Sequence, residues 1–361
     1  MPASYPHKPT VFVLGAGATK AFLPRAPLMV DDYELERLLS LFTGFSYAYD
    51  VLQWEKAQRP NGLINIERLM TRLDGFMPYD AGDPAMYQLG LLLAEVKSVF
   101  IRRIALAREG PFYRDELSQL ARICVKQGIT CITFNYDDVL DQALWEVDQV
   151  VRDSMKPGSY WHPDGGYGFF CRPSDVTVSS HPGYMDKTSM HLLKLHGSIN
   201  WYARRGTARP YDIQSVMHDE EWYPPSSVAF PHQELIRPHL EPDPFIVPPV
   251  LIKSALTKEP LLKLVWALAK DCLERAHSIV FIGYSMPSTD LAASYLFGEA
   301  LEGRDHCVKV VNLSAGGDER EALIRAYKKV FPKIAENQFE FKDALQWSAE
   351  FVGTAQNEQN A

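Results

Sequence analysis

The sequence predicts an α/β protein built on a doubly wound parallel sheet. Two observations support this: short apolar runs typical of buried strands are spread along the 361 residues, and amphipathic helical patterns lie between them. Strands that alternate with helices form right-handed crossover units, and such units build a parallel sheet covered on both faces. The predicted architecture is therefore Rossmann-like, with a large helical insertion and Pro-rich loops.

Each predicted strand is a run of four to six mostly apolar residues that ends at a turn or polar residue. Runs of this kind are typical of strands that are buried on both faces. The five runs are Thr10–Leu14, Thr130–Phe134, Leu192–Leu195, Ser278–Ile282 and Val308–Leu313.

The predicted helices carry apolar residues at i, i+3, i+4 and i+7, the spacing of one buried helix face. Three patterns are complete, and a shorter one predicts a helix after the fifth strand. They comprise Ile66, Leu69, Met70 and Leu73; Leu140, Ala143, Leu144 and Val147; Leu261, Leu264, Val265 and Leu268; and Ala322, Leu323 and Ala326.

The spacing between the first two strands predicts the insertion. Residues 15–129 are too many for one crossover and contain further helical patterns, notably Met86–Leu106. We expect a single domain over residues 1–361 with a helical insertion at about 30–125.

Two further stretches are predicted to be irregular loop regions beside the site, at about 151–190 and 203–250. The second includes Pro224–Pro249, with eight prolines in 26 residues. That density excludes long helices and central strands. Such loops either wrap the fold or form a lid beside a ligand, and the sequence leaves both readings open.

Composition limits the classes of function. Lys and Arg number 37 and Asp and Glu 45, which gives a net charge of −8, so no overall positive field attracts nucleic acid or an anionic membrane. The chain has no apolar stretch of the roughly 18 residues that a membrane span needs. Its five scattered cysteines form no C-x-x-C pair and its histidines no H-E-x-x-H motif, so no metal is predicted. We expect a soluble cytoplasmic protein.

Small or polar residues follow every predicted strand. Gly15-Ala16-Gly17-Ala18-Thr19 follows the first strand. The later strands are followed by Asn135-Tyr136-Asp137, by His196-Gly197-Ser198, by Gly283-Tyr284-Ser285 with Asp290 beyond, and by Asn312 near the end of the fifth. Each of these alone can be a helix cap or a turn former. Together they lie at the carboxyl edge of a parallel sheet, where ligands bind.

The Gly-rich turn has the residue types that let backbone N–H groups approach a phosphate. An ordinary dinucleotide-binding dehydrogenase fits poorly, because Lys20 stands at the third glycine of G-x-G-x-x-G and no acidic residue ends a second strand about 20 positions further on.

In this order, "GAGAT", "TFNYD", "LHGSINW", "GYSMPSTD" and "VN" resemble the motifs of the sirtuin-like NAD-hydrolase domain family, in its bacterial anti-phage defence branch. The resemblance implies that NAD is the substrate and that Asn135 and His196 are catalytic. It further implies that Asp137 lies near the nicotinamide carboxamide or ribose. Binding roles for the remaining residues follow from it as well: Gly15, Ala16, Gly17 and Thr19 around the pyrophosphate, and Gly283, Ser285 and Asn312 around the phosphates and adenosine.

Two departures from the family pattern bear on the reaction. Phe134 replaces the Gln that precedes the catalytic Asn in conventional sirtuins, and the Pro-Asp-Phe-Arg loop and four-cysteine zinc module of the deacylases are absent. We therefore expect an NAD+ hydrolase that gives nicotinamide and ADP-ribose. The alternatives are an NAD-dependent protein deacylase and a non-catalytic NAD- or ADP-ribose-binding subunit.

The residue types suit this chemistry. Cleavage of the nicotinamide–ribose bond develops positive charge at C1′ and needs an oriented water and a base. An amide such as Asn135 can both donate and accept hydrogen bonds, and the imidazole of His196 is a suitable base near neutral pH.

An NAD-depleting effector must be regulated, because unrestrained activity is lethal to the cell. We expect control through a homo-oligomer or a separate activator. The resemblance suggests a HerA-type ATPase or an Argonaute-like protein as such a partner. Direct nucleic-acid binding and membrane association are not expected.

Overall fold

The computed structural model describes most of the chain. The described residues are 9–58, 62–74, 82–107, 110–153, 161–169, 171–173, 190–204, 212–215, 240–249, 259–303, 306–314 and 316–360. The statements below concern these residues.

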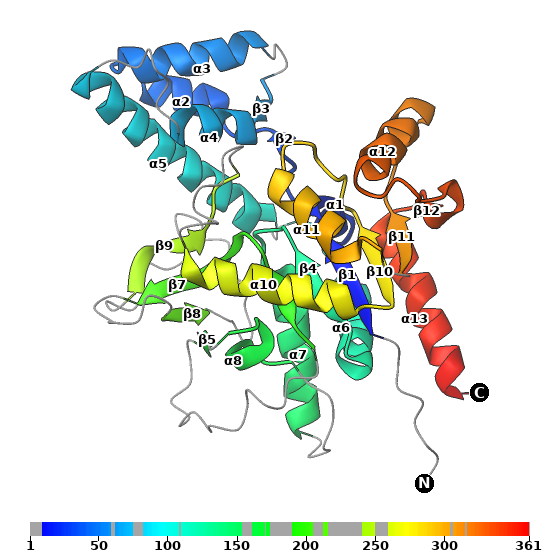
Figure 1. The fold of residues 1–361 in the computed structure, drawn as a ribbon. Helices are drawn as coiled ribbons and strands as arrows, with labels where there is room; N and C mark the ends of the chain where they lie inside the picture. Colours follow the sequence, from blue (N-terminus) through cyan, green and yellow to red (C-terminus); the bar gives the residue numbers. More distant parts are fainter. Residues whose placement is uncertain are drawn as a thin grey trace.

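A parallel sheet of six strands forms the centre of the described fold, in the order β12-β11-β10-β1-β4-β6 (Figure 1). The strands are β1 (Thr10–Leu14), β4 (Thr130–Thr133), β6 (Leu192–Lys194), β10 (Ser278–Ile282), β11 (Cys307–Val311) and β12 (Phe339–Glu340). Numbered within this sheet alone, the order across it is 3-2-1-4-5-6, the doubly wound order of dinucleotide-binding folds. The predicted fold class is confirmed.

All five predicted strands form. Two have the predicted bounds, and the ends of the other three differ by one or two residues. The sixth, β12, was not predicted, because two residues carry no periodic pattern. It extends the edge of the sheet by pairing with Val310 and Val311.

Helices cover both faces of the sheet, as a doubly wound fold requires. On one face α1 (Ala16–Phe22), α6 (Arg114–Gln127), α7 (Val139–Asp153) and α13 (Ala344–Asn360) pack together. On the other lie α10 (Pro260–Arg275), α11 (Leu291–Leu301) and α12 (Gly317–Val330) (Figure 1). The helices predicted around Leu140, Leu261 and Leu323 are α7, α10 and α12.

The insertion after β1 has its own hydrophobic cluster, from Tyr33 to Ile104. It contains β2 (Val30–Asp31), α2 (Leu35–Leu41), α3 (Ser46–Gln58), β3 (Ile64–Asn65), α4 (Ile66–Asp74) and α5 (Asp83–Leu106). In Figure 1 these helices, blue to cyan, stand to one side of the sheet. Although α6 falls within the range expected for the insertion, its buried residues belong to the main core under the sheet.

Tyr136 and Ile199 lie in the part of the chain that carries the site, yet they pack in the insertion's cluster. The insertion therefore packs against segments of the chain that carry the site.

A small second sheet adjoins β6, in the order β5-β8-β7-β9. Its strands are β5 (Cys171–Pro173), β7 (Gly197–Arg204), β8 (Ile213–Ser215) and β9 (Leu240–Ile246), and the short helix α8 (Pro163–Gly166) precedes β5. The prolines of β9 are accommodated because it is an edge strand. Most of the Pro-rich stretch predicted as a wrap or lid lies outside the described residues.

Among the described helices, none has the length and apolar character needed to cross a bilayer.

Candidate active site

The candidate site lies where the strand order reverses, between β1 and β10, at the carboxyl ends of the strands. A cavity of about 490 Å³ opens there. Eight of the ten residues named from the sequence line it: Gly15, Ala16, Gly17, Asn135, His196, Gly283, Ser285 and Asn312. The edge of the sheet thus brings together groups up to 297 positions apart in the chain (312 minus 15).

The glycines of this edge let two turns pack backbone against backbone. The Gly17 N–H donates to the Gly283 carbonyl at 3.0 Å, and the Gly15 N–H donates to the Ile282 carbonyl at 3.0 Å. A Cβ on Gly15 would lie 2.5 Å from the Gly283 oxygen. Gly283 has a φ of +60°, and a Cβ there would lie 2.0 Å from the Ala18 nitrogen. The N–H groups of Gly15 and Gly17 are therefore paired with the end of β10 and the turn that follows it. Ala16 also lines the cavity, and because it is the first residue of α1 its N–H has no intrahelical acceptor.

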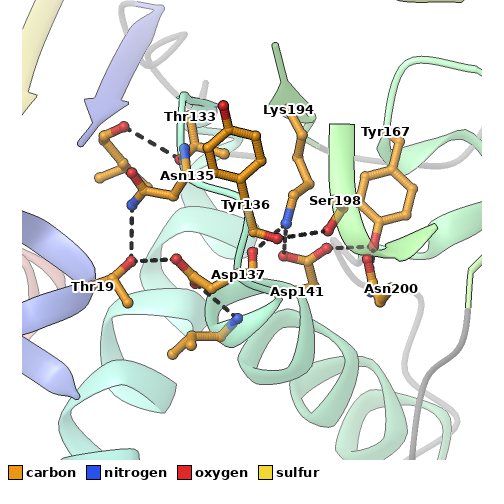
Figure 2. Close-up of polar contacts among 12 residues, drawn as sticks. Thr19, Thr133, Asn135, Tyr136, Asp137, Asp141, Tyr167, Lys194, Ser198 and Asn200 are labelled. Atoms are coloured by element: carbon orange, nitrogen blue, oxygen red, sulfur yellow. Dashed lines mark hydrogen bonds and ion pairs between the residues drawn. The ribbon is translucent and has the colours of Figure 1, made fainter. Parts of the chain in front are cut away.

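Asn135 is held in one orientation by hydrogen bonds to the turn after β1. Its Nδ2 donates to the Gly15 carbonyl at 2.9 Å. The same nitrogen donates to Thr19 Oγ1 at 2.8 Å, as Figure 2 shows. A carbonyl can only accept, so nitrogen must be the amide atom that faces Gly15. Both amide protons are used in this way, and Oδ1 is the atom of Asn135 left for a ligand. The sequence suggested an amide that both donates and accepts, whereas the geometry leaves it an acceptor.

Thr19 and Asp137 lie behind Asn135 instead of lining the large cavity. The Thr19 hydroxyl donates to Asp137 Oδ2 at 2.8 Å, and Asp137 Oδ1 accepts the Val139 N–H at 3.1 Å (Figure 2). With Asn135 they line a smaller internal cavity of about 40 Å³. The resemblance placed Thr19 at the pyrophosphate and Asp137 at the nicotinamide or ribose. Those roles stay predictions, and in the structure the two side chains form a relay of hydrogen bonds that fixes the direction of the Asn135 amide.

His196 lies between β6 and β7 among aromatic rings. It stacks on Tyr136 with 5.8 Å between ring centroids and meets the edge of Phe134 at 5.4 Å. Its Nε2 lies 3.6 Å from Asp290 Oδ2, and both side chains are 5% exposed. The next residue, Gly197, has a φ of +79°, and a Cβ there would lie 2.2 Å from the Phe245 oxygen. Glycine is therefore required for β9 to approach this turn.

The residues around His196 also hold the loop that carries Asn135. The Tyr136 carbonyl accepts the Ile199 N–H at 2.9 Å and the Ser198 hydroxyl at 3.4 Å. The Asp137 carbonyl accepts a hydrogen bond from Lys194 Nζ. These contacts join the segments that flank Asn135 and His196, and Figure 2 shows those made by Lys194 and Ser198.

Lys194 is the charged member of this junction, and it is fully buried. Its Nζ lies 2.9 Å from Asp141 Oδ2, with the two side chains 0% and 1% exposed. Asp141 Oδ1 accepts the Tyr167 hydroxyl at 2.5 Å, and Tyr167 in turn accepts from Asn200 Nδ2 at 3.4 Å (Figure 2). The buried ion pair is thus compensated by further hydrogen bonds, as a stable one must be.

Ser285 and Asn312 lie across the cavity from Asn135. Ser285 is exposed, and Asn312 Nδ2 donates to the Tyr284 carbonyl at 3.1 Å. Asn312 thereby supports the turn after β10 while its side chain lines the cavity.

Glu67, Tyr284 and Asp290 are among the cavity residues to which the sequence analysis assigned no role. Asp290 was noted beyond the fourth strand, but its position before a helix is that of an ordinary cap. Glu67 comes from the insertion, and no motif marks it. Trp201, close to His196 in the chain, is fully buried against Tyr167 and Phe169 and belongs to the core.

The two tyrosines of the cavity remain protonated. Burial raises the pKa of Tyr136 well above its ordinary value, and the negative charges of Asp290 and Glu67 raise it further. Burial likewise raises the pKa of Tyr284, with Asp290 the next cause. Within the described part of the chain, no three His, Cys, Asp or Glu side chains gather as a metal site would require.

Comparison with known proteins gives structural likeness only. No protein-family model and no curated protein matches the chain. One similar solved structure is a complex of a Sir2 homologue with NAD, at 14% identity and a TM-score of 0.40 over 90% of both chains. Another is Sir2 with an inhibitor, 2′-O-acetyl-ADP-ribose and a deacetylated p53 peptide, at 14% identity and a TM-score of 0.38, covering 96% of this chain and 94% of that one. Likeness at this level carries no functional conclusion.

Proposed function

We propose that the protein is an NAD+ glycohydrolase that releases nicotinamide and leaves ADP-ribose. The observation that carries the proposal is the convergence of Asn135 and His196 on one cavity at the switch point of the sheet, which the glycine turns after β1 and β10 also line. The ordered motifs that resemble the sirtuin-like NAD hydrolases point to the same residues.

The cavity suits a dinucleotide. Its volume of about 490 Å³ falls within the roughly 300–1,000 Å³ of small-molecule sites, and switch points of this strand order are where dinucleotides bind. In the proposed pose the nicotinamide ribose faces Asn135 and His196, and the adenosine half extends toward Ser285 and Asn312. The aromatic rings around His196 shield the reacting end from bulk water.

The two candidate catalytic groups divide the work. In the proposed reaction the glycosidic electron pair leaves with nicotinamide, and a water oxygen attacks C1′. Asn135 Oδ1 accepts a hydrogen bond from a ribose hydroxyl or from the water and so orients it. His196 takes the proton that the water loses. A base of this kind contributes about 10²- to 10⁴-fold.

The test is nicotinamide release from NAD+ by the purified protein, with Asn135→Ala and His196→Ala beside the wild type. We expect release by the wild type and a loss of about 10²-fold or more in each variant, with unchanged circular dichroism. Release that requires an acetyl-lysine peptide would instead identify a deacylase. NAD+ binding without release would identify a binding subunit or an enzyme that lacks its activator.

We also propose that the activity serves as an NAD-depleting effector of bacterial anti-phage defence, held in check by oligomerisation or by a partner such as a HerA-type ATPase or an Argonaute-like protein. This part rests on the motif resemblance alone. Infection of cells that carry the wild type, with Asn135→Ala as the control, should lower cellular NAD only where Asn135 is present. Unchanged NAD during infection would refute the defence role but leave the enzymatic proposal standing.

A further inference from the structure

We propose that Asp290 is the positioning residue for His196, holding the imidazole in one orientation with its Nε2 protonated. The catalytic part of this inference rests on the proposed function. The ion pair itself can be tested without NAD.

Each oxygen of the Asp290 carboxylate has a contact in the structure. Oδ1 accepts the Ala293 N–H at 3.3 Å, which makes Asp290 the N-cap of α11, and Oδ2 lies 3.6 Å from His196 Nε2. One oxygen thus anchors the side chain to a helix while the other faces the imidazole. Asp290 follows β10 and His196 follows β6, and β1 and β4 lie between these two strands in the sheet. The contact therefore connects two separate parts of the carboxyl edge at the cavity.

Capping alone does not account for this arrangement. An N-cap needs one side-chain oxygen, and Asn or Ser caps about as well as Asp. Burying the second carboxylate oxygen costs free energy unless a charged or hydrogen-bonding partner compensates it. His196, equally buried, lies at the distance of such a partner. The separation is longer than a hydrogen bond, and catalytic hydrogen bonds often tighten only once substrate is bound.

Among the described residues, the imidazole of His196 is surrounded by aromatic rings and faces the charged carboxylate of Asp290. From the loop after β4 come Phe134 and Tyr136, and from α10 comes Trp266 with its ring centroid 6.4 Å away. Tyr284, on the β10 side of the cavity, is like Tyr136 held protonated by burial. Besides Asp290, the carboxylate of Glu67 in α4 is found among the described residues that line the cavity.

The arrangement gives the imidazole a defined role in the proposed hydrolysis. A proton held on Nε2 by Asp290 leaves the lone pair of Nδ1 as the base. When the water oxygen bonds to C1′ and the glycosidic pair leaves with nicotinamide, the water proton passes to the ring. The carboxylate then stabilises the imidazolium that results.

The deciding variant is Asp290→Asn, which keeps the helix cap and removes the charge. Glu67→Gln is its matched control, because Glu67 is a second carboxylate that lines the cavity, but it comes from α4 of the insertion and does not cap α11. The titration of His196 is followed by NMR in protein with labelled histidine, without NAD. The pH dependence of kcat/KM is measured on the same samples.

We expect the His196 midpoint in Asp290→Asn to fall by about one pH unit, since an opposite charge at this distance favours the protonated ring. Glu67→Gln should move it less. In the active enzyme the acid limb of kcat/KM should move the same way, and kcat should fall about tenfold or more with KM nearly unchanged.

Equal displacement in the two variants, or none in Asp290→Asn, would overturn the ion pair. A displaced titration with an unchanged kcat and pH profile would overturn the positioning role. Should the wild type release no nicotinamide, the proposed function fails, and the NMR titration still decides whether Asp290 holds His196.

Discussion

The two candidate catalytic residues are held in contrasting ways. The Asn135 amide donates to the Gly15 carbonyl and to the Thr19 hydroxyl, which in turn donates to the Asp137 carboxylate, through hydrogen bonds of 2.8–2.9 Å. His196 stacks on Tyr136, meets the edge of Phe134, and has the Asp290 carboxylate 3.6 Å from its Nε2. The difference suits the two tasks: an amide that orients a substrate must not turn, whereas a base must change its charge without disturbing its neighbours.

The largest effect is expected from a substitution of Lys194, whose Nζ donates to the Asp137 carbonyl in the loop that carries Asn135. Lys194→Met leaves Asp141 as a buried carboxylate without its cation. We expect the free energy of unfolding to fall by about 3–5 kcal/mol, the usual result of removing one member of a buried pair. Urea denaturation measures it.

The double variant Lys194→Met/Asp141→Leu is the control. It removes both charges, so its stability should return close to that of the wild type. Its kcat should nevertheless remain reduced, because the Asp137 carbonyl has lost its donor. A double variant as unstable as the single one would show that the pair stabilises the fold, and a double variant with full kcat would show that it does not position the loop.

The sequence contains a sign of this pair but not its partner. A lysine inside the apolar run Leu192–Leu195 indicates a buried charge that must be compensated. Its partner lies 53 positions away, and tertiary packing alone decides which carboxylate that is.

The same limit explains how much of the site was predictable. Strand ends and their polar residues follow from local pattern and from the geometry of a parallel sheet. For this reason eight residues of the cavity, among them Gly15 and Asn312, could be named from the sequence. The orientations of the Thr19 and Asp137 side chains depend on the hydrogen bond between them, and the two residues are 118 positions apart in the sequence. Glu67 reaches the cavity only because the insertion packs against Tyr136.

A smaller effect is expected from reversing the relay behind Asn135. In Asp137→Asn the new amide can donate to Thr19, whose hydroxyl then turns toward Asn135 and opposes its Nδ2. Either the bond to Thr19 is lost or the amide flips and places Oδ1 against the Gly15 carbonyl. We expect kcat for nicotinamide release to fall about 10²-fold, as when one preorganised polar contact is lost.

Thr19 offers the matched pair for this prediction. Thr19→Ser retains the hydroxyl and should keep kcat within about threefold, whereas Thr19→Val should resemble Asp137→Asn. Full activity in Thr19→Val would show that Gly15 alone orients the amide.

The smallest effect is expected at Tyr284, which packs on Phe134, a ring that in turn contacts His196. Its buried hydroxyl has no hydrogen-bond partner among the described residues, although its ring stacks on Phe134 with centroids 4.7 Å apart. Tyr284→Phe should therefore change the free energy of unfolding by no more than about 0.5 kcal/mol near neutral pH. Tyr327→Phe is the comparison, because its hydroxyl donates to the Tyr284 carbonyl at 2.8 Å and its loss should cost about 0.5–1.5 kcal/mol.

The sign of the pH dependence separates the hydroxyl from the ring. Burial raises the pKa of Tyr284 in the folded state, so the stability that goes with its protonated form is fully present below the ordinary tyrosine pKa of about 10 and declines above it. Tyr284→Phe should accordingly lose less stability than the wild type when the pH is raised beyond 10, with kcat at neutral pH nearly unchanged. A large loss of kcat in this variant would mean that a hydroxyl, and not only ring faces and a carboxylate, supports His196, and the contrast with Asn135 would then be weaker than the structure indicates.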